Sequence, residues 1–324
     1  MKKQVNQTIT VKNKYLQDFA FETIENGFLG VPQEYIDRGY LKNYDDAKVI
    51  VVPFGLEKSV SYGGGTKNGP RAIIEASPQI ELFDEEFWFE PFLQFGVLTM
   101  KPPKIDTSSV EKSLEQLEKI TDKILQAGKF PLILGGEHSI TAGSIRPFVK
   151  KYPDLAILHF DAHADLRDGY DGEYFSHASA LRRVMDNPIS TLISCGIRNI
   201  SASEIPFLEA NSKRIKIHFA KDKKNWNVQE IVAPLKDRPV FLTFDIDGFD
   251  SGIMQATGTP EPGGMQWDDA LEIIRQASKI CKIVGSDVVE LAPVKYLHSC
   301  DFLASKLCYK ILSHALCNPI STFK

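Results

Sequence analysis

The sequence predicts an α/β protein with a central, mostly parallel sheet flanked by helices on both faces. Two observations support this. Six short apolar segments alternate with longer helical patterns, and each segment is apolar on both faces, as in central strands covered on two sides. Alternation also indicates right-handed crossovers. The segments are KVIVVPF (48–54), FPLILGG (130–136), LAILHFD (155–161), TLISCGI (191–197), PVFLTFD (239–245) and KIVGSDVV (282–289).

The spacing of apolar residues predicts three helices in particular. The clearest begins near Ser108, where Glu111 completes a capping box, and it ends at Gly128. A second is expected over residues 268–280. A third helix is expected to follow Gly69-Pro70, because proline is favoured in the first turn of a helix.

Length and composition indicate one catalytic domain. The chain has 324 residues, of which 43% are hydrophobic and 25% charged, as in a globular protein with a sizeable core. Residues 1–45 lack a strong pattern and are expected to form an N-terminal arm or edge segment. Residues 46–324 form the expected catalytic domain, since no repeat or linker divides them.

Charge and hydropathy exclude several classes of protein. A net charge of −4 without a basic stripe argues against binding to nucleic acid, and it leaves room for a cationic substrate. No stretch approaches the ~18 apolar residues that span a bilayer, and no apolar run follows the basic start MKKQVNQTIT. Five scattered cysteines without a CxxC pair suggest reduced thiols. We therefore expect a cytoplasmic protein without a membrane partner.

Polar clusters follow five of the six expected strands. They are GGEHS (135–139), DAHAD (161–165), GIRN (196–199), DIDGFD (245–250) and VVELAP (288–293). Ligands of open α/β sheets bind at the carboxyl ends of the strands, so these clusters should meet in one crevice.

Alternate residues of HFDAHADLRD (159–168) carry groups suited to metal binding. Side chains at i, i+2 and i+4 point to one side, so those of DAHAD converge if the extended form continues past the strand. DIDGFD repeats the i, i+2 spacing, and GGEHS adds an imidazole. The candidate ligands are His138, Asp161, His163, Asp165, Asp245 and Asp247.

Four carboxylates without a basic partner would repel one another in this crevice. Two divalent cations would relieve the repulsion, and a metal pair can hold a hydroxide for hydrolysis. Mixed oxygen and nitrogen ligands without thiolate suit Mn²⁺, with Zn²⁺, Fe²⁺ or Co²⁺ as alternatives. Each motif alone could be a helix cap or a tight turn, but three strand ends together predict a binuclear metal hydrolase.

Other histidines and a glycine-rich stretch receive structural interpretations. His159 shares a face with Asp161 but is expected to be a satisfied core residue, and His218, His298 and His314 lack acidic partners at motif spacing. SYGGGTKNGP (61–70) lacks the GK[ST] ending of a phosphate-binding loop and follows a segment that resembles an edge strand. It is expected to be a flexible loop leading into a helix.

The motifs, taken in order, resemble those of the ureohydrolase family of arginases and agmatinases over residues 45–320. GGEHS, DAHADLRD, SHAS, GIRN, DIDGFD, TGTPEPGG and DVVELAP carry the resemblance. It implies an arginase-like fold, two manganese ions per chain, and hydrolysis of a guanidino group to urea and an amine. It also implies a homo-oligomer, either a trimer or a hexamer.

The resemblance assigns roles to individual residues. One manganese ion would be held by His138, Asp161, Asp165 and Asp245, and the other by Asp161, His163, Asp245 and Asp247. Asp165 would also hydrogen-bond the bridging hydroxide. His177 matches the proton-shuttling histidine, and Glu290 matches the glutamate that orients the guanidinium. Metal-activated attack and protonation of the leaving amine both suit this chemistry.

Substrate choice depends on departures from the arginases. Arg167 and Ser201 stand where arginases carry an asparagine and an aspartate that contact the α-amino acid end, which weighs against L-arginine. DLRDGYDGEYFSHAS resembles the agmatinase branch, and Asp168, Asp171 and Glu173 could attract the distal amine of agmatine or be plain solvated acids of a loop. The leading hypothesis is hydrolysis of agmatine to putrescine and urea in polyamine biosynthesis, with Glu290, Arg167, Asp168 and Ser201 as candidate substrate contacts.

Several alternatives remain open. They are guanidinobutyrase, another guanidino-acid amidinohydrolase, arginase, and a non-catalytic metal-binding family member. Ser251 and Gln255 also replace two prolines that the family usually carries, which puts the rigidity of that loop in question without touching a candidate ligand.

Overall fold

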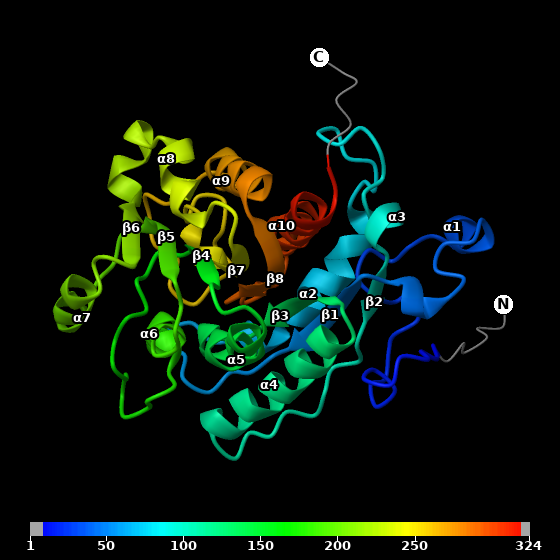
Figure 1. Cartoon of the computed structure of the whole chain (residues 1–324), viewed down its shortest axis with the longest axis horizontal. Helices are drawn as coiled ribbons and strands as arrows, with labels where there is room; N and C mark the ends of the chain where they lie inside the picture. Colours follow the sequence, from blue (N-terminus) through cyan, green and yellow to red (C-terminus); the bar gives the residue numbers. More distant parts are fainter. Residues whose placement is uncertain (1–8, 319–324) are drawn as a thin grey trace.

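The computed structural model describes residues 9–318, which build an eight-stranded, entirely parallel sheet (Figure 1). The order of the strands across the sheet is β2-β1-β3-β8-β7-β4-β5-β6. The α/β class and the central parallel sheet predicted from the sequence are confirmed. The strands are β1 (Val49–Phe54), β2 (Val97–Thr99), β3 (Phe130–Gly135), β4 (Ala156–Phe160), β5 (Thr191–Ile197), β6 (Ile215–Phe219), β7 (Pro239–Asp245) and β8 (Lys282–Val289).

All six expected strands are present, and the two edge strands were not predicted. β2 has only three residues, too few for a recognisable pattern. β6 is mostly half-buried and carries the exposed Lys216, so it lacks the apolar character of the inner strands. β1 was expected to resemble an edge strand, but it lies between β2 and β3. Short, poorly covered edges are the parts of a sheet that leave the weakest sequence signal.

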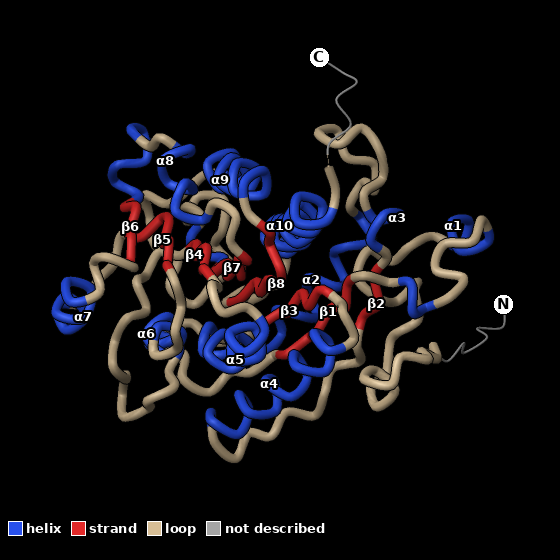
Figure 2. The backbone as a smooth tube through the Cα atoms, viewed as in Figure 1, coloured by secondary structure: helices blue, strands red, loops and turns tan. Residues whose placement is uncertain are grey.

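Helices cover both faces of the sheet (Figure 2). One layer holds α4 (Val110–Gln126), α5 (Thr141–Lys151) and α6 (Ala180–Met185), which pack in that order. The other holds α2 (Gly69–Ala76), α8 (Val228–Val232), α9 (Trp267–Ile280) and α10 (His298–Leu316). The short helices α1 (Gln33–Asp37), α3 (Phe92–Phe95) and α7 (Ile205–Ala210) lie toward the two ends of the sheet (Figure 1).

β1 shows why the inner strands are apolar on both faces. Val49 and Val51 belong to the hydrophobic cluster that includes residues of α2, α9 and α10. Ile50 and Val52 belong to the cluster under α4. All four side chains are fully buried, so each face of the strand packs against a helical layer.

The start of α4 differs by one residue from the expected cap. The side chain of Ser109 accepts a hydrogen bond from the backbone nitrogen of Lys112 at 3.1 Å, and the helix begins at Val110. Ser108 instead donates its hydroxyl to Asp106 at 2.7 Å. The predicted Ser108–Glu111 capping box is therefore wrong, because either serine offers the required oxygen and the local turn selects between them.

Residues 9–45 pack along the β1–β2 side of the sheet. Ile9, Val11, Leu16 and Phe21 are buried in the cluster that also contains α4. A boundary near residue 45 stays a prediction. All five cysteines lie among the described residues and carry free thiols. Within residues 9–318, no helix combines the length and the apolar character needed to cross a membrane.

Candidate metal centre and active site

A cavity of about 390 Å³ opens at the carboxyl ends of the central strands. Its lining comes from segments that follow β3, β4, β5, β7 and β8, together with the loop after β1. This volume is typical of a pocket for a small molecule. The structure therefore brings the polar motifs of five strand ends into one place, as the sequence predicts.

Three carboxylates converge on the imidazole of His138, which begins the 3-10 turn after β3. Its Nδ1 lies 3.1 Å from Asp161 Oδ2, 3.0 Å from Asp165 Oδ2 and 3.3 Å from Asp245 Oδ2. His138 and Asp161 are almost completely buried. These four side chains form the deep half of the candidate centre.

A second group forms around His163. Its Nδ1 lies 3.1 Å from Asp247 Oδ2 and 3.5 Å from Asp161 Oδ1. Asp161 therefore presents one oxygen to each half. Backbone donors orient the other acids, because the nitrogen of Asp247 donates to Asp245 Oδ1 at 2.9 Å and that of Ala162 to Asp247 Oδ1 at 3.0 Å.

Asp165 reaches the cluster by a different route from the one expected. The extended form does not continue to this residue, whose φ is 53°. The chain instead pairs His163 with Asn199 in an isolated parallel bridge and then enters a left-handed conformation that aspartate tolerates better than most residues. The convergence is thus present, but its expected cause, an uninterrupted i, i+2, i+4 strand, is wrong.

The environment of His138 fits a bound metal ion. Nε2 of His138 lies 3.0 Å from the hydroxyl of Thr243, which can accept a hydrogen bond from the Nε2–H tautomer. That tautomer points the lone pair of Nδ1 at the three carboxylates. Nδ1 is buried and makes no well-aligned hydrogen bond with any of them. Such a lone pair among carboxylate oxygens provides a donor set for a metal ion.

The pKa values of three residues in this cluster are shifted by burial and by the charges of the neighbouring carboxylates. Burial alone would lower the pKa of His163, but the charges of Asp247 and Asp161 raise it to about 12. Burial and the charge of Asp161 raise the pKa of Asp165 to about 7. Burial and the neighbouring Asp247 and Asp161 also raise the pKa of Asp245 well above its ordinary value. The cluster holds more negative charge than its own residues compensate.

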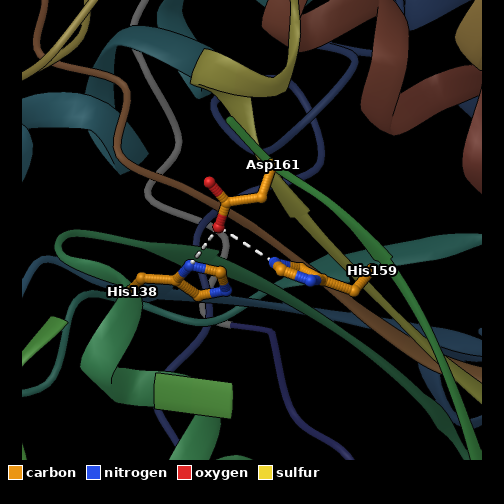
Figure 3. Close-up of side chains that lie close together, drawn as sticks. All are labelled: His138, His159 and Asp161. Atoms are coloured by element: carbon orange, nitrogen blue, oxygen red, sulfur yellow. Dashed lines mark hydrogen bonds and ion pairs between the residues drawn. The ribbon is translucent and has the colours of Figure 1, made fainter. Parts of the chain in front are cut away.

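His159 contacts the centre from behind. Its Nε2 lies 2.9 Å from Asp161 Oδ2, and its Nδ1 lies 2.9 Å from the hydroxyl of Ser194. The carboxylate of Asp161 consequently sits between the imidazoles of His138 and His159 (Figure 3). His159 is a satisfied core residue, as expected, and it also fixes the orientation of Asp161.

His177 lies at the wall of the cavity with two serines. Its Nε2 is 2.7 Å from Ser61 Oγ and its Nδ1 is 3.3 Å from Ser59 Oγ. Ser59 donates its hydroxyl to Glu137 Oε1 at 2.9 Å. Burial lowers the pKa of His177, although the charge of Glu137 opposes this shift. The ring is thus attached through hydroxyl groups to a buried carboxylate.

Glu290 follows β8 with a left-handed backbone, φ 65°. Its Oε1 accepts a hydrogen bond from the backbone nitrogen of His138 at 2.7 Å, while the residue lines the cavity. Burial and the charge of Glu137 raise its pKa well above the ordinary value. A cation entering the cavity would lower that pKa again, because an opposite charge favours the ionised form.

The structure places some of the candidate substrate contacts in the cavity lining and one of them outside it. Arg167 and Ser201 line the cavity, and the guanidinium of Arg167 lies 4.8 Å from the ring centre of Tyr170. Asp168 is not brought into the cavity lining. Its carboxylate pairs with Arg183 at 2.6 Å and remains largely exposed.

Several residues at the site had no role assigned from the sequence. Glu137, Arg198 and Glu261 all stand inside motifs that carried the resemblance, in GGEHS, GIRN and TGTPEPGG. Ser59 and Ser61 lie in the loop after β1, of which only residues 61–70 were interpreted, as a flexible loop. Both serines contact His177. For the three charged residues, their place inside motifs that carried the resemblance was the available signal.

Carboxylates and imidazoles gathered over a parallel sheet are typical of the class of metal-dependent hydrolases. Residues 46–313 match the model of the arginase family, and the chain belongs to that family. It is 34% identical to an N(1)-aminopropylagmatine ureohydrolase of Synechocystis sp., covering 89% of this chain and 96% of the relative. It is also 34% identical to an agmatinase of Bacillus anthracis, covering 82% and 92%.

A solved structure agrees with these relatives. The agmatine ureohydrolase of Thermoplasma volcanium superposes with a TM-score of 0.74 at 28% identity, over 85% of this chain and 92% of that one. The chain is therefore an agmatinase-like ureohydrolase, a hydrolase that acts on guanidino groups. Its family is one of binuclear metal enzymes, and its His–Asp groups can hold metal.

Proposed function

We propose that this ureohydrolase is a manganese-dependent agmatinase that hydrolyses agmatine to putrescine and urea. One observation carries the proposal: a small, acid-rich cavity lies directly over the convergent carboxylates and imidazoles. A cavity of this charge favours a cationic guanidine. Arg167 and Ser201 stand at its wall in place of the residues by which arginases would contact an α-amino acid.

Six residues would hold the two Mn²⁺ ions: His138, Asp161, His163, Asp165, Asp245 and Asp247. Their oxygen and nitrogen donors without thiolate suit manganese. When bound, the metal pair supplies a water activated for attack on the resonance-stabilised guanidinium carbon. The carboxylates that converge on His138 and His163 would otherwise repel one another.

Glu290 would orient the substrate. One of its oxygens is fixed by the backbone nitrogen of His138, which leaves the other to accept an N–H of the planar guanidinium. The substrate's charge would keep the carboxylate ionised in its buried position. Orientation then fixes the guanidinium carbon over the His–Asp groups.

His177 would move the proton that the leaving amine requires. Its ring lies at the cavity wall, and an imidazole titrates in the range suited to general acid catalysis. Ser59 and Glu137 hold the Nδ1 side, so the Nε2 side, next to Ser61, is the side that can exchange a proton with the substrate.

Urea release from a substrate panel tests the proposal. Purified protein loaded with Mn²⁺ is offered agmatine, N(1)-aminopropylagmatine, 4-guanidinobutyrate, L-arginine and guanidine, and kcat/KM is measured for each. Agmatine should give the highest value, with putrescine as the co-product. No urea from agmatine would overturn the choice of substrate. His177→Ala should reduce kcat far more than it changes KM.

N(1)-aminopropylagmatine is the second candidate, because the Synechocystis relative of that name matches over almost its whole length. The same panel separates the two. Metal analysis of the active protein should find two ions per chain, and fewer than two would support the non-catalytic alternative. We further propose a cytoplasmic homo-oligomer, a trimer or hexamer, which sedimentation analysis would measure.

A further inference from the structure

Six acidic residues line the cavity: Asp165, Glu204, Asp245, Asp247, Glu261 and Glu290. Five of them have structural or predicted catalytic work. The three aspartates belong to the candidate metal centre, and Glu290 accepts the backbone nitrogen of His138. Glu204 uses both oxygens, accepting from the backbone nitrogens of Leu166 at 2.7 Å and Ser201 at 2.5 Å.

Glu261 is the exception. Its carboxylate makes no hydrogen bond and no ion pair with any residue in the described part of the chain, although its backbone is firmly held. It follows the strand end of β7, in the segment that also brings Thr259 to the cavity. A half-buried carboxylate left without a partner at a binding cavity is poised to receive a cation from outside.

Arg198 fixes where Glu261 lies. Its guanidinium donates to the backbone oxygens of Glu261 at 2.8 Å and Pro262 at 3.1 Å. The same group donates to the backbone oxygens of Asp247 at 2.8 Å and Phe249 at 3.1 Å. One cation thereby joins the backbone of a candidate metal ligand to the backbone of Glu261, so the fold sets where the Glu261 backbone lies relative to the metal centre.

We infer that Glu261 determines substrate specificity by binding the ammonium group at the end of the substrate opposite the guanidinium. This role rests on the proposed function, in which the guanidinium end lies against Glu290. The opposite end must then face the remaining cavity wall. The substrate class is a guanidine with a distal ammonium group, and a guanidine with a distal carboxylate is repelled.

Arg167 carries a positive charge at the cavity wall, and a neighbouring ring determines where that charge lies. Its guanidinium lies over the ring of Tyr170, which provides a favourable cation–π contact. This contact holds the guanidinium at the ring without neutralising it. No side chain in the described part of the chain holds the carboxylate of Glu261 in the same way.

The test compares wild type with Glu261→Gln on three guanidines that each carry a four-carbon chain: agmatine, 1-butylguanidine, which lacks the amine, and 4-guanidinobutyrate. Glu261→Gln should raise KM for agmatine about tenfold with little change in kcat, because it weakens one charged contact. Its kcat/KM for 1-butylguanidine should stay within about twofold of wild type. The preference for agmatine over 4-guanidinobutyrate should shrink.

Asp171→Asn is the matched control. Asp171, one of the acids suggested from the sequence to attract the amine, is exposed and is not part of the cavity lining. Its left-handed φ of 49° suits asparagine. It removes the same charge without touching the cavity and should leave all three kcat/KM values unchanged. An equal effect of both variants would show general electrostatic attraction and overturn the role of Glu261.

Metal content in Glu261→Gln, expected to equal that of wild type, reports on the integrity of the centre. Equal losses on agmatine and 1-butylguanidine, or no loss on either, would also overturn the role of Glu261. Failure of the proposed function is distinguishable, since it appears in wild type as an absence of urea from agmatine. Activity of wild type on another guanidine with a distal ammonium would transfer the comparison to that substrate.

Discussion

Two groups of buried charges in this molecule differ in how their charge is balanced. The His–Asp cluster consists of His138, Asp161, His163, Asp165, Asp245 and Asp247. The Lys310 cluster lies between α9, α10 and the segment before α3, and consists of Asp84, Glu85, Glu86, Arg275, Lys310 and His314. Both remove several charged side chains from water.

The buried charges of the Lys310 cluster balance, because Asp84 and Glu86 face Lys310 and Arg275 while Glu85 is largely exposed. The Nζ of Lys310, only 1% exposed, lies 2.9 Å from Asp84 and 3.0 Å from Glu86, and Arg275 contacts Glu86 at 2.8 Å. The His–Asp cluster has four carboxylates and only imidazoles to oppose them. Burial without internal balance marks the site that takes a cation from solution, whereas balanced burial marks a structural network.

Neutralising one acid of the His–Asp cluster should have the largest effect. Asp165→Asn keeps a residue that tolerates φ 53° and should reduce kcat/KM on the order of 10³-fold. In chelator the variant should be more stable than wild type by roughly 1–3 kcal/mol, because burial raises the pKa of Asp165 to about 7 and thus disfavours its charge. Urea release and denaturant unfolding measure the two effects. A less stable metal-free variant would contradict the comparison.

Removing one charge from the Lys310 cluster should instead lower the stability of the protein. Lys310→Met leaves the buried carboxylate of Asp84 uncompensated and should lower the free energy of unfolding by about 3–5 kcal/mol. Folded protein should keep its kcat. The double variant Lys310→Met with Asp84→Asn should recover part of the loss in denaturant unfolding. Without such recovery, lost packing rather than charge would explain the effect.

A smaller effect on stability should appear at acidic pH, and it arises from His314 in the Lys310 cluster. Burial lowers the pKa of His314 to about 4, despite the opposing charge of Glu86. The unfolded state therefore binds more protons between about pH 4 and the ordinary histidine value near 6.5. The stability that depends on His314 being neutral is fully present above pH 6.5 and is lost as the pH falls toward 4. Near pH 5 the loss is about 2 kcal/mol.

His314→Phe provides the comparison, because the imidazole already packs against the ring of Phe87 at 5.1 Å. With Mn²⁺ present throughout, wild type should lose about 2 kcal/mol more than the variant between pH 7 and pH 5. Equal losses would assign the acid sensitivity to other groups, the His–Asp cluster first.

Local patterns sufficed to predict the inner strands and the meeting of their polar ends. Asp161 and Asp245 were predicted to lie close together because the carboxyl ends of parallel strands meet at one edge of the sheet. Asp165 needed a left-handed turn, and Asp168 is directed by Arg183, fifteen positions along the chain. Such choices depend on tertiary contacts, which spacing does not encode.

The Lys310 cluster shows the same limit more strongly. Lys310 lies in a long helix, and its acid partner Asp84 is 226 positions away. His314 was rightly given a structural interpretation, yet its neighbours were invisible in the sequence. The residues next to Lys310 in the sequence do not indicate that its cationic end is buried. Lysine side chains are ordinarily exposed to water.

The six backbone oxygens around Arg198 have a consequence for protein engineering. A transplanted specificity loop must present its carbonyls to this one side chain in the same places. A loop from a relative with another backbone path would release donors that also brace the segment after β7. Changes of substrate preference in this scaffold should therefore be easier to reach by exchanging side chains than by exchanging loops.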